Sequence, residues 1–164
     1  MTEENKDYFE SPISLNYNYT TGFATTRFLK KVALGKLVGQ KCPKCKAVYV
    51  PPRGSCPRDG IPTNEEVELP DTGSVESFTI VHIPIPGNPI VPPYVCAMIR
   101  LDGADISFLH LIQDIDLAEI RIGMRVKAVW KDKSEWDTTL ENIKWFQPTG
   151  EPDMDPDSYI FKTK

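Results

Sequence analysis

The sequence contains no long hydrophobic run. Its longest apolar stretches, such as Tyr94 to Ile99, are far shorter than the roughly 18 residues that a membrane-spanning helix needs. Residues 1–7 are polar and acidic, whereas a secretory signal has a basic start followed by an apolar stretch. We therefore expect no membrane association and a cytoplasmic location.

Recognisable catalytic motifs are also missing. The glycines form neither a G-x-G-x-x-G pattern nor a P-loop, which argues against a helix start that binds nucleotide phosphates. His82 and His110 lie in strand-like segments and are expected to be structural. Cys96 lies in an almost continuous apolar segment, where a free cysteine is usually a small buried hydrophobe. We expect no catalytic residue in this chain.

Acidic side chains are absent from residues 11–58. This stretch carries nine basic side chains, namely Arg27, Lys30, Lys31, Lys36, Lys41, Lys44, Lys46, Arg53 and Arg58. The whole chain nevertheless has a net charge of −4, because residues 59–164 are strongly acidic. A concentrated basic surface attracts phosphates, nucleic acid or an acidic protein face. The alternative is a solvated basic face without a ligand.

The remaining composition is that of a globular protein with short elements. The 164 residues are 40% hydrophobic and 26% charged, which allows one domain or two small ones with a buried core. The 15 prolines favour strands and turns over long helices.

The N-terminal part divides into two segments. Residues 1–20 are polar, rich in Tyr and Asn, and are interpreted as a leader arm. Residues 21–64 are predicted to form one amphipathic helix, or two short ones, followed by a compact module of turns. The helix would begin at a Thr20 or Thr21 cap and end near Leu37, with an apolar face made by Phe23, Phe28, Leu29, Val32 and Leu37.

From Glu65 the hydrophobic period changes to two. Residues 65–147 are predicted to form a small antiparallel barrel, with strands at 67–69, 75–83, 94–101, 106–112, 125–131 and 138–146. The Asp102-Gly103 pair predicts a hairpin turn. A short helix is predicted over 114–121, where a five-stranded OB-fold often has one.

The C-terminal segment, residues 148–164, is interpreted as an acidic, proline-rich tail that would not pack by itself. Its last large residues, Tyr159 to Phe161, are expected to dock on the barrel or on a partner subunit.

Two copies of one short pattern carry the clearest chemistry. Cys42-Pro-Lys-Cys45 and Cys56-Pro-Arg-Asp59 each place two potential ligands three residues apart on a tight turn. Two such turns joined by a hairpin can form a tetrahedral zinc site, with residues 47–50 as the strand and 51–54 as the turn. Asp59 takes the place of a fourth cysteine, and a carboxylate oxygen is an accepted zinc ligand.

The same pattern allows other interpretations. A degenerate site without metal remains an alternative, because Asp59 replaces a thiolate. A thioredoxin-like redox role is disfavoured, because no matching strand and helix follow and the second pair lacks a cysteine. A bound zinc would be structural, since a module of some 20 residues cannot hold itself together by core burial alone.

Several motifs together resemble a known family. They are residues 36–45, 48–53 and 56–57 around the cysteines, followed by 73–79, 92–95, 123–126 and 145–148 in the predicted barrel. In this order they resemble two-domain proteins in which a rubredoxin-like zinc ribbon precedes an OB-fold. The family usually has a fourth cysteine where this chain has Asp59. The resemblance implies a mainly β fold with an N-terminal helix, the ribbon, and then the barrel.

The resemblance also implies a role in acyl-CoA metabolism. Members of this family are small accessory subunits of thiolases, hydroxymethylglutaryl-CoA synthase or steroid side-chain retro-aldolases, and the large partner carries the catalytic cysteine. The chain is most similar to subunits of the thiolase type that cleaves benzoylsuccinyl-CoA in anaerobic toluene degradation. The basic block would then bind the phosphates of CoA or acyl-CoA, with Lys41, Lys44, Arg53 and Arg58 as the expected contacts.

Two rival functions remain open. Zinc ribbons and OB-folds also bind single-stranded nucleic acid, although the acidic barrel argues against this. A free-standing acyl-CoA-binding protein or hydrolase is the other rival.

Overall fold

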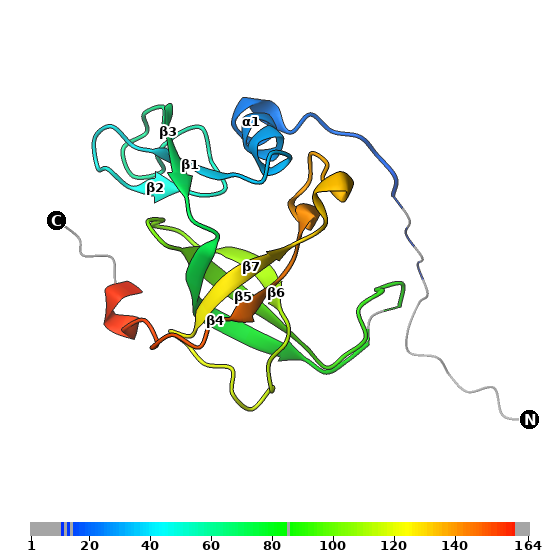
Figure 1. The fold of residues 1–164 in the computed structure, drawn as a ribbon. Coiled ribbons are helices and arrows are strands. Elements are labelled where there is room, and N and C mark those ends of the chain that lie inside the picture. Colours follow the sequence, from blue (N-terminus) through cyan, green and yellow to red (C-terminus); the bar gives the residue numbers. More distant parts are fainter. Residues whose placement is uncertain (1–10, 12, 14, 85, 160–164) are drawn as a thin grey trace, which may run out of the picture.

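The computed structural model describes residues 11, 13, 15–84 and 86–159 (Figure 1). Within them the chain is mainly β, as predicted, with one α-helix followed by eight strands. The elements are α1 (Gly22–Val32), β1 (Leu37–Lys41), β2 (Val48–Tyr49), β3 (Glu65–Leu69), β4 (Thr72–Val81), β5 (Tyr94–Leu101), β6 (Phe108–Ile112), β7 (Arg125–Trp130) and β8 (Ile143–Pro148). Three short 3-10 helices are η1 (Lys133–Glu135), η2 (Leu140–Asn142) and η3 (Pro156–Tyr159). None of the helices in this part of the chain has the length and apolarity needed to cross a bilayer.

Helix α1 follows Thr21, the predicted cap, but ends at Val32 instead of near Leu37. The chain turns at Gly35, whose φ of +73° favours glycine. A Cβ at Gly35 would lie 2.5 Å from the ring of Trp136, so this ring packs directly on the glycine backbone. The helix therefore stops early, and Leu37 is buried as the first residue of β1.

The first sheet has three strands in the order β2-β1-β3. The strand at 65–69, expected in the barrel, belongs to this sheet instead and pairs with β1 from Leu37↔Leu69 to Lys41↔Glu65. Leu37 and Leu69 are both buried at one end of the pairing, while Lys41 and Glu65 form an ion pair at the other. Apolar burial and charge together fix this register.

The second sheet is a closed barrel in the order β4-β5-β6-β8-β7. All neighbours are antiparallel except β6 and β8, which are parallel and joined at Ile112↔Phe146. This confirms the predicted five-stranded OB-fold. The predicted Asp102-Gly103 turn connects β5 to β6, and Gly103 has a φ of +84°.

Two local predictions in the barrel were wrong. Residues 114–121 form turns instead of a helix, because Asp114 has a φ of +58° and a single backbone bond, from Glu119 to Asp116, closes a turn. The predicted strand over 138–146 starts only at Ile143, after η2. The buried Asn142 amide explains this start, since it donates to the carbonyl of Val32 in α1 at 3.3 Å and so holds η2 against the helix.

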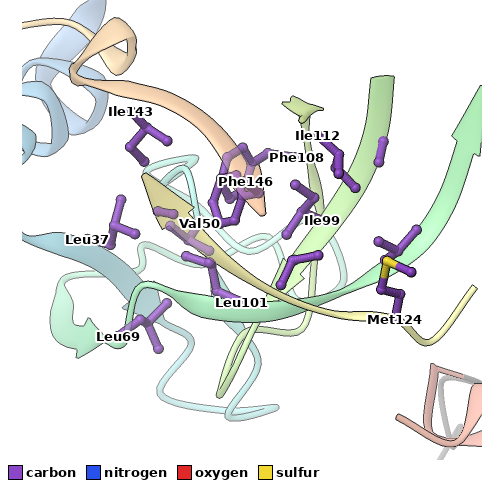
Figure 2. Packing of buried hydrophobic residues seen from close by; sticks show 14 of the residues in the cluster. Leu37, Val50, Leu69, Ile99, Leu101, Phe108, Ile112, Met124, Ile143 and Phe146 are labelled. Carbon is purple, nitrogen blue, oxygen red and sulfur yellow. The ribbon is translucent and has the colours of Figure 1, made fainter. Parts of the chain in front are cut away.

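One hydrophobic core runs through the whole fold. Figure 2 shows Leu37 and Leu69 of the first sheet, and Val50 just after β2, near the barrel residues Leu101 and Phe146. All belong to one cluster of buried side chains, which also includes two α1 residues, Phe28 and Val32. The helix, the first sheet and the barrel are therefore packed as one body.

The tail lies against the barrel over its described part. The Met154 N–H donates to the Gly123 carbonyl at 2.8 Å, and Arg121 forms an ion pair with Asp153. A Cβ at Gly123 would lie 2.5 Å from the Met154 carbonyl oxygen, so glycine permits this approach. Of the apolar end expected to dock, residues 160 and 161 lie outside the described residues.

Candidate metal centre

Two turns with the same backbone geometry build the centre. The Cys42 N–H donates to the Ala47 carbonyl at 2.9 Å, and the Cys56 N–H donates to the Ile61 carbonyl at 2.8 Å. Each bond spans five residues and closes the turn around its cysteine. The duplicated sequence pattern is therefore a duplicated structure.

The fifth residue of each turn has a left-handed backbone. Lys46 has a φ of +66° and Gly60 a φ of +67°. Their N–H groups donate back to the carbonyls of Cys42 and Cys56, at 3.1 and 2.8 Å. This conformation is uncommon for a residue other than glycine, so the geometry of the turn decides the backbone at Lys46.

The four predicted ligand atoms meet at one point. The Sγ atoms of Cys42, Cys45 and Cys56 and a carboxylate oxygen of Asp59 all lie within 4.8 Å of one another. Cys45 Sγ is 3.6 Å from Cys56 Sγ, and Asp59 Oδ2 is 3.4 Å from Cys42 Sγ and 3.5 Å from Cys56 Sγ.

These separations fit a tetrahedral zinc ion. Zinc–sulfur bonds of about 2.3 Å and zinc–oxygen bonds of about 2.1 Å would place two sulfurs about 3.8 Å apart and sulfur and oxygen about 3.6 Å apart. Three thiolates and one carboxylate also match the ligand preferences of zinc. Cys42 and Cys56 are almost fully buried, which is typical of a closed structural site.

Burial and neighbouring polar groups shift the pKa values of two of the four ligands, Asp59 and Cys45. Hydrogen bonds from the Cys45 thiol and the Lys44 ammonium hold the pKa of Asp59 well below its usual range. The Ala47 backbone favours the Cys45 thiolate, but burial and the nearby Asp59 and cysteines outweigh it and raise the pKa of Cys45 to about 11. A metal must therefore displace a proton at Cys45, whereas Asp59 already carries its charge.

Tyr49 is a residue of the centre that sequence reasoning missed. Its buried hydroxyl lies 3.2 Å from Cys56 Sγ. Burial disfavours the Cys56 thiolate, yet this hydroxyl and the backbone N–H groups of Asp59 and Arg58 lower the pKa of Cys56. The Tyr49–Cys56 spacing matches no ligand motif, so the sequence held no signal for this contact.

Strand β3 pairs with much of the basic block. Glu66 accepts ion pairs from Arg27 and Lys31, and Glu68 accepts one from Lys36. Glu66 and Glu68 follow the acid-free stretch in the sequence. As part of β3 they lie beside it in the structure, because β3 pairs with β1. Part of the charge of the block is therefore balanced within the chain.

The four residues expected to contact CoA have different surroundings. Lys41 pairs with Glu65 at 3.6 Å, and Lys44 pairs with Asp59 at 3.1 Å. Arg53 and Arg58 are exposed. Lys44 and Arg58 occupy the same third position in the two turns, so both flank the metal centre.

The barrel carries a hollow of about 570 Å³ that is lined by residues of β5, β6 and β8 and of the neighbouring loops. Cys96 lines it and is half-buried, so the prediction of a buried cysteine was wrong. The reason is the alternation of β5, which points Val95 and Ala97 inward and Cys96 outward. His110 also lines the hollow and is held as a structural residue, since its Nδ1 accepts from the Leu111 N–H at 2.9 Å.

His82 is not the structural strand residue that the sequence predicts. It lies just after the end of β4 and is exposed, so it is not held in the barrel as His110 is. Burial lowers the pKa of His110. Neither histidine lies in the metal cluster found among the described residues.

Comparisons with known proteins agree with this architecture. The family model described as the rubredoxin-like zinc ribbon domain of ChsH2 matches residues 30–65. The model described as the C-terminal OB-fold domain of ChsH2 matches residues 66–131. The boundary between the two models falls within a residue of the start of β3.

Two curated relatives are similar over the same region. A DUF35 domain-containing scaffold protein of Methanocaldococcus jannaschii is 36% identical over 97 residues, which cover 58% of this chain and 67% of the relative. A probable enoyl-CoA hydratase alpha subunit of Thermomonospora curvata is 35% identical over 95 residues. That match covers 58% of this chain but only 29% of the hydratase subunit.

Two solved structures have a similar fold. A chain of the structure described as the Ltp2-ChsH2(DUF35) aldolase has a TM-score of 0.60 and 27% identity, covering 80% of this chain and 98% of that one. A DUF35-family protein of Sulfolobus solfataricus has a TM-score of 0.59 and 23% identity, covering 78% and 85%.

Proposed function

We propose that this chain, which belongs to the ChsH2-type family of a rubredoxin-like zinc ribbon followed by an OB-fold, is a non-catalytic accessory subunit of an acyl-CoA enzyme. The observation that carries this proposal is the similarity to a chain of the Ltp2-ChsH2 aldolase, of which 98% is covered. The relative described as an enoyl-CoA hydratase subunit supports the same class of chemistry.

We further propose a thiolase-type catalytic partner. The sequence motifs of the ribbon and barrel resemble those of thiolase accessory subunits, and benzoylsuccinyl-CoA cleavage by CoA is the expected reaction. An acyl-CoA retro-aldolase is the alternative partner, because the aldolase structure has the same two domains. In either case the partner supplies the reacting groups.

Zinc would have a structural role in this subunit. Cys42, Cys45, Cys56 and Asp59 would hold the ion, which would neutralise the thiolates and tie the two turns together. The low exposure of Cys42 and Cys56 favours a closed site over one that keeps a position open for water.

Binding of CoA phosphates by this chain remains a proposal, and the ion pairs refine it. Arg53 is the better candidate, because it is exposed, whereas Lys41 and Lys44 are each paired with an acid. Arg58 stays a candidate because of its place beside the metal centre. A guanidinium also binds phosphate through two parallel hydrogen bonds.

The nucleic-acid alternative has less support. OB-folds that bind single-stranded nucleic acid use the face that carries the hollow here, and the bases stack on aromatic side chains. Here the hollow is lined mainly by aliphatic residues, including Ile90, Leu109 and Leu140.

The cytoplasmic location stays a prediction.

Reconstitution of the catalytic partner tests the proposal. The large subunit, purified from the same organism, would be assayed with and without this chain for thiolysis, retro-aldol cleavage and hydration of acyl-CoA substrates. We expect thiolysis to need this chain, and the Cys42→Ser variant to fail where Cys96→Ser succeeds. Full activity of the large subunit alone, or turnover by this chain alone, would contradict the proposal.

A further inference from the structure

The segment before α1 has a regular pattern that no element of this chain uses. From residue 13 to 20 the sequence reads Ile-Ser-Leu-Asn-Tyr-Asn-Tyr-Thr, with large apolar and small polar residues in strict alternation. This period of two is that of a strand with one apolar face. Within the leader arm of residues 1–20, we call the described residues 11, 13 and 15–20 the arm.

The apolar face of the arm is exposed. Ile13, Leu15, Tyr17 and Tyr19 are each between 74% and 79% exposed, and the rings of Tyr17 and Tyr19 lie 6.3 Å apart. Figure 1 shows residues 15–20 running away from α1 in an extended form. Among the described residues of the arm, none belongs to a helix or a strand.

Exposed apolar side chains at regular spacing mark a contact surface. A strand with one apolar face needs two things from a partner. It needs an unpaired strand edge for its backbone N–H and C=O groups, and apolar pockets at alternate positions for its side chains.

This chain offers no good edge for a second copy of the arm among its described strands. The barrel is closed, and at the edges of the first sheet β2 has only two residues. The other edge strand, β3, carries Glu65, Glu66 and Glu68, and charged side chains protect an edge against pairing. The arm itself has no charged residue, so it would gain no ion pair with this charged edge.

We propose that the arm adds as a strand to an uncharged, open sheet edge of the catalytic acyl-CoA subunit. Leu15, Tyr17 and their neighbours at the same spacing fill apolar pockets there, while the Asn side chains face solvent. This proposal rests on the proposed function and names the surface through which the two subunits join.

Two double variants of the full chain test it. Leu15→Ser with Tyr17→Ser removes the apolar face, and Asn16→Ser with Asn18→Ser is the matched control on the polar face. Sedimentation would measure the affinity of each for the catalytic subunit. We expect the first to bind about 100-fold more weakly, as for the loss of two buried apolar side chains, and the control to stay within about threefold.

Hydrogen exchange on the wild-type complex separates strand addition from other contacts. Every second arm amide should exchange slowly, because a strand points alternate N–H groups toward one neighbour. Both variants should keep the metal content and melting temperature of the wild type, since the arm packs on no core residue.

Three outcomes would overturn the proposal. In the first, the Leu15/Tyr17 variant forms a stable complex with the affinity of the wild type. The arm would then not be the contact, although the accessory role would stand. Another is a dimer of the chain alone that this variant dissolves, which would assign the arm to a second copy. Absence of any complex with the wild-type chain would overturn both the arm proposal and the proposed function.

Discussion

The first sheet and the barrel are built from strands of similar sequence character but are stabilised differently. The first sheet has strands of five, two and five residues, and two of its connections are the cysteine turns. The barrel closes five strands around buried side chains such as Ile99 and Phe146. A sheet this short buries few side chains of its own, so we expect metal ligands to add stability that core burial alone would not supply.

The difference shows where each region can tolerate change. The stability of the barrel depends on the volume of its buried side chains, because these interdigitate and fill its interior. The first sheet depends on four ligand atoms and on two turns that place them. The shared core cluster, which contains both Val50 and Phe146, couples the two regions.

Removal of one metal ligand should have the largest effect. In the Cys56→Ser variant we expect loss of bound zinc and unfolding of β1 to β3, because structural zinc contributes about 10–16 kcal/mol in isolated zinc-finger peptides. Metal analysis and amide exchange would measure this. Cys96→Ser is the control, since this cysteine lies outside the cluster. Protected β1 amides without metal would refute the expectation.

Truncation in the barrel should be the next largest effect. Phe146 is fully buried, so Phe146→Ala should lower the free energy of unfolding by about 3–5 kcal/mol in urea titrations. Lys144→Ala on the same strand is exposed and should change it by no more than about 0.5 kcal/mol. A Phe146→Ala loss below about 1 kcal/mol would mean that the barrel interior is not the main source of stability.

A third prediction concerns the joint between the regions. The Asp105 carboxylate, from the β5–β6 connection, accepts a hydrogen bond from the Val48 N–H in β2 at 2.7 Å. Asp105→Ala should cost about 1–3 kcal/mol, because it leaves a part-buried donor without its partner. Asp105→Asn keeps an acceptor and should recover most of the loss. Equal melting temperatures for the Ala variant and the wild type would show that this hydrogen bond between the barrel and the first sheet does not stabilise the fold.

The smallest effect should come from an ion pair of the barrel. Asp102 accepts two hydrogen bonds from Arg125, at 2.7 and 2.6 Å, and these lower its pKa. The folded pKa lies below the unfolded value of about 3.9, so this stabilisation is present above about pH 4 and is lost as the pH falls through the folded pKa.

Asp102→Asn should therefore be less stable than the wild type by about 1 kcal/mol at pH 7 in urea titrations. The difference between the two should shrink as the pH falls below about 4, because the carboxylate of the unfolded wild type is protonated first and this offsets the native ion pair. A difference that stays constant between pH 7 and pH 3 would exclude this role for the Asp102 charge.

Local patterns in the sequence predicted what depends on neighbours along the chain. The two turns were predictable because all four ligands lie in two four-residue repeats. The Asp102-Gly103 hairpin was predictable for the same reason. The metal cluster and the OB-fold followed from these signals.

Contacts between distant segments were not predictable in this way. Glu65 to Leu69 has the alternation of a strand, but its partner is β1 and not the barrel, and only the register with Leu37 and Lys41 decides this. Helix α1 ends early because Trp136, about a hundred residues later, packs on Gly35. Such choices depend on tertiary packing, which overrides local propensity.

The central claim is that this chain is a zinc-containing accessory subunit of an acyl-CoA enzyme. Native mass spectrometry of the tagged chain, purified gently from its own cells, tests it most directly. We expect a stoichiometric complex with a thiolase-type or related acyl-CoA catalytic subunit and about one zinc ion for each copy of this chain. A monomer without metal and without a catalytic partner would contradict it.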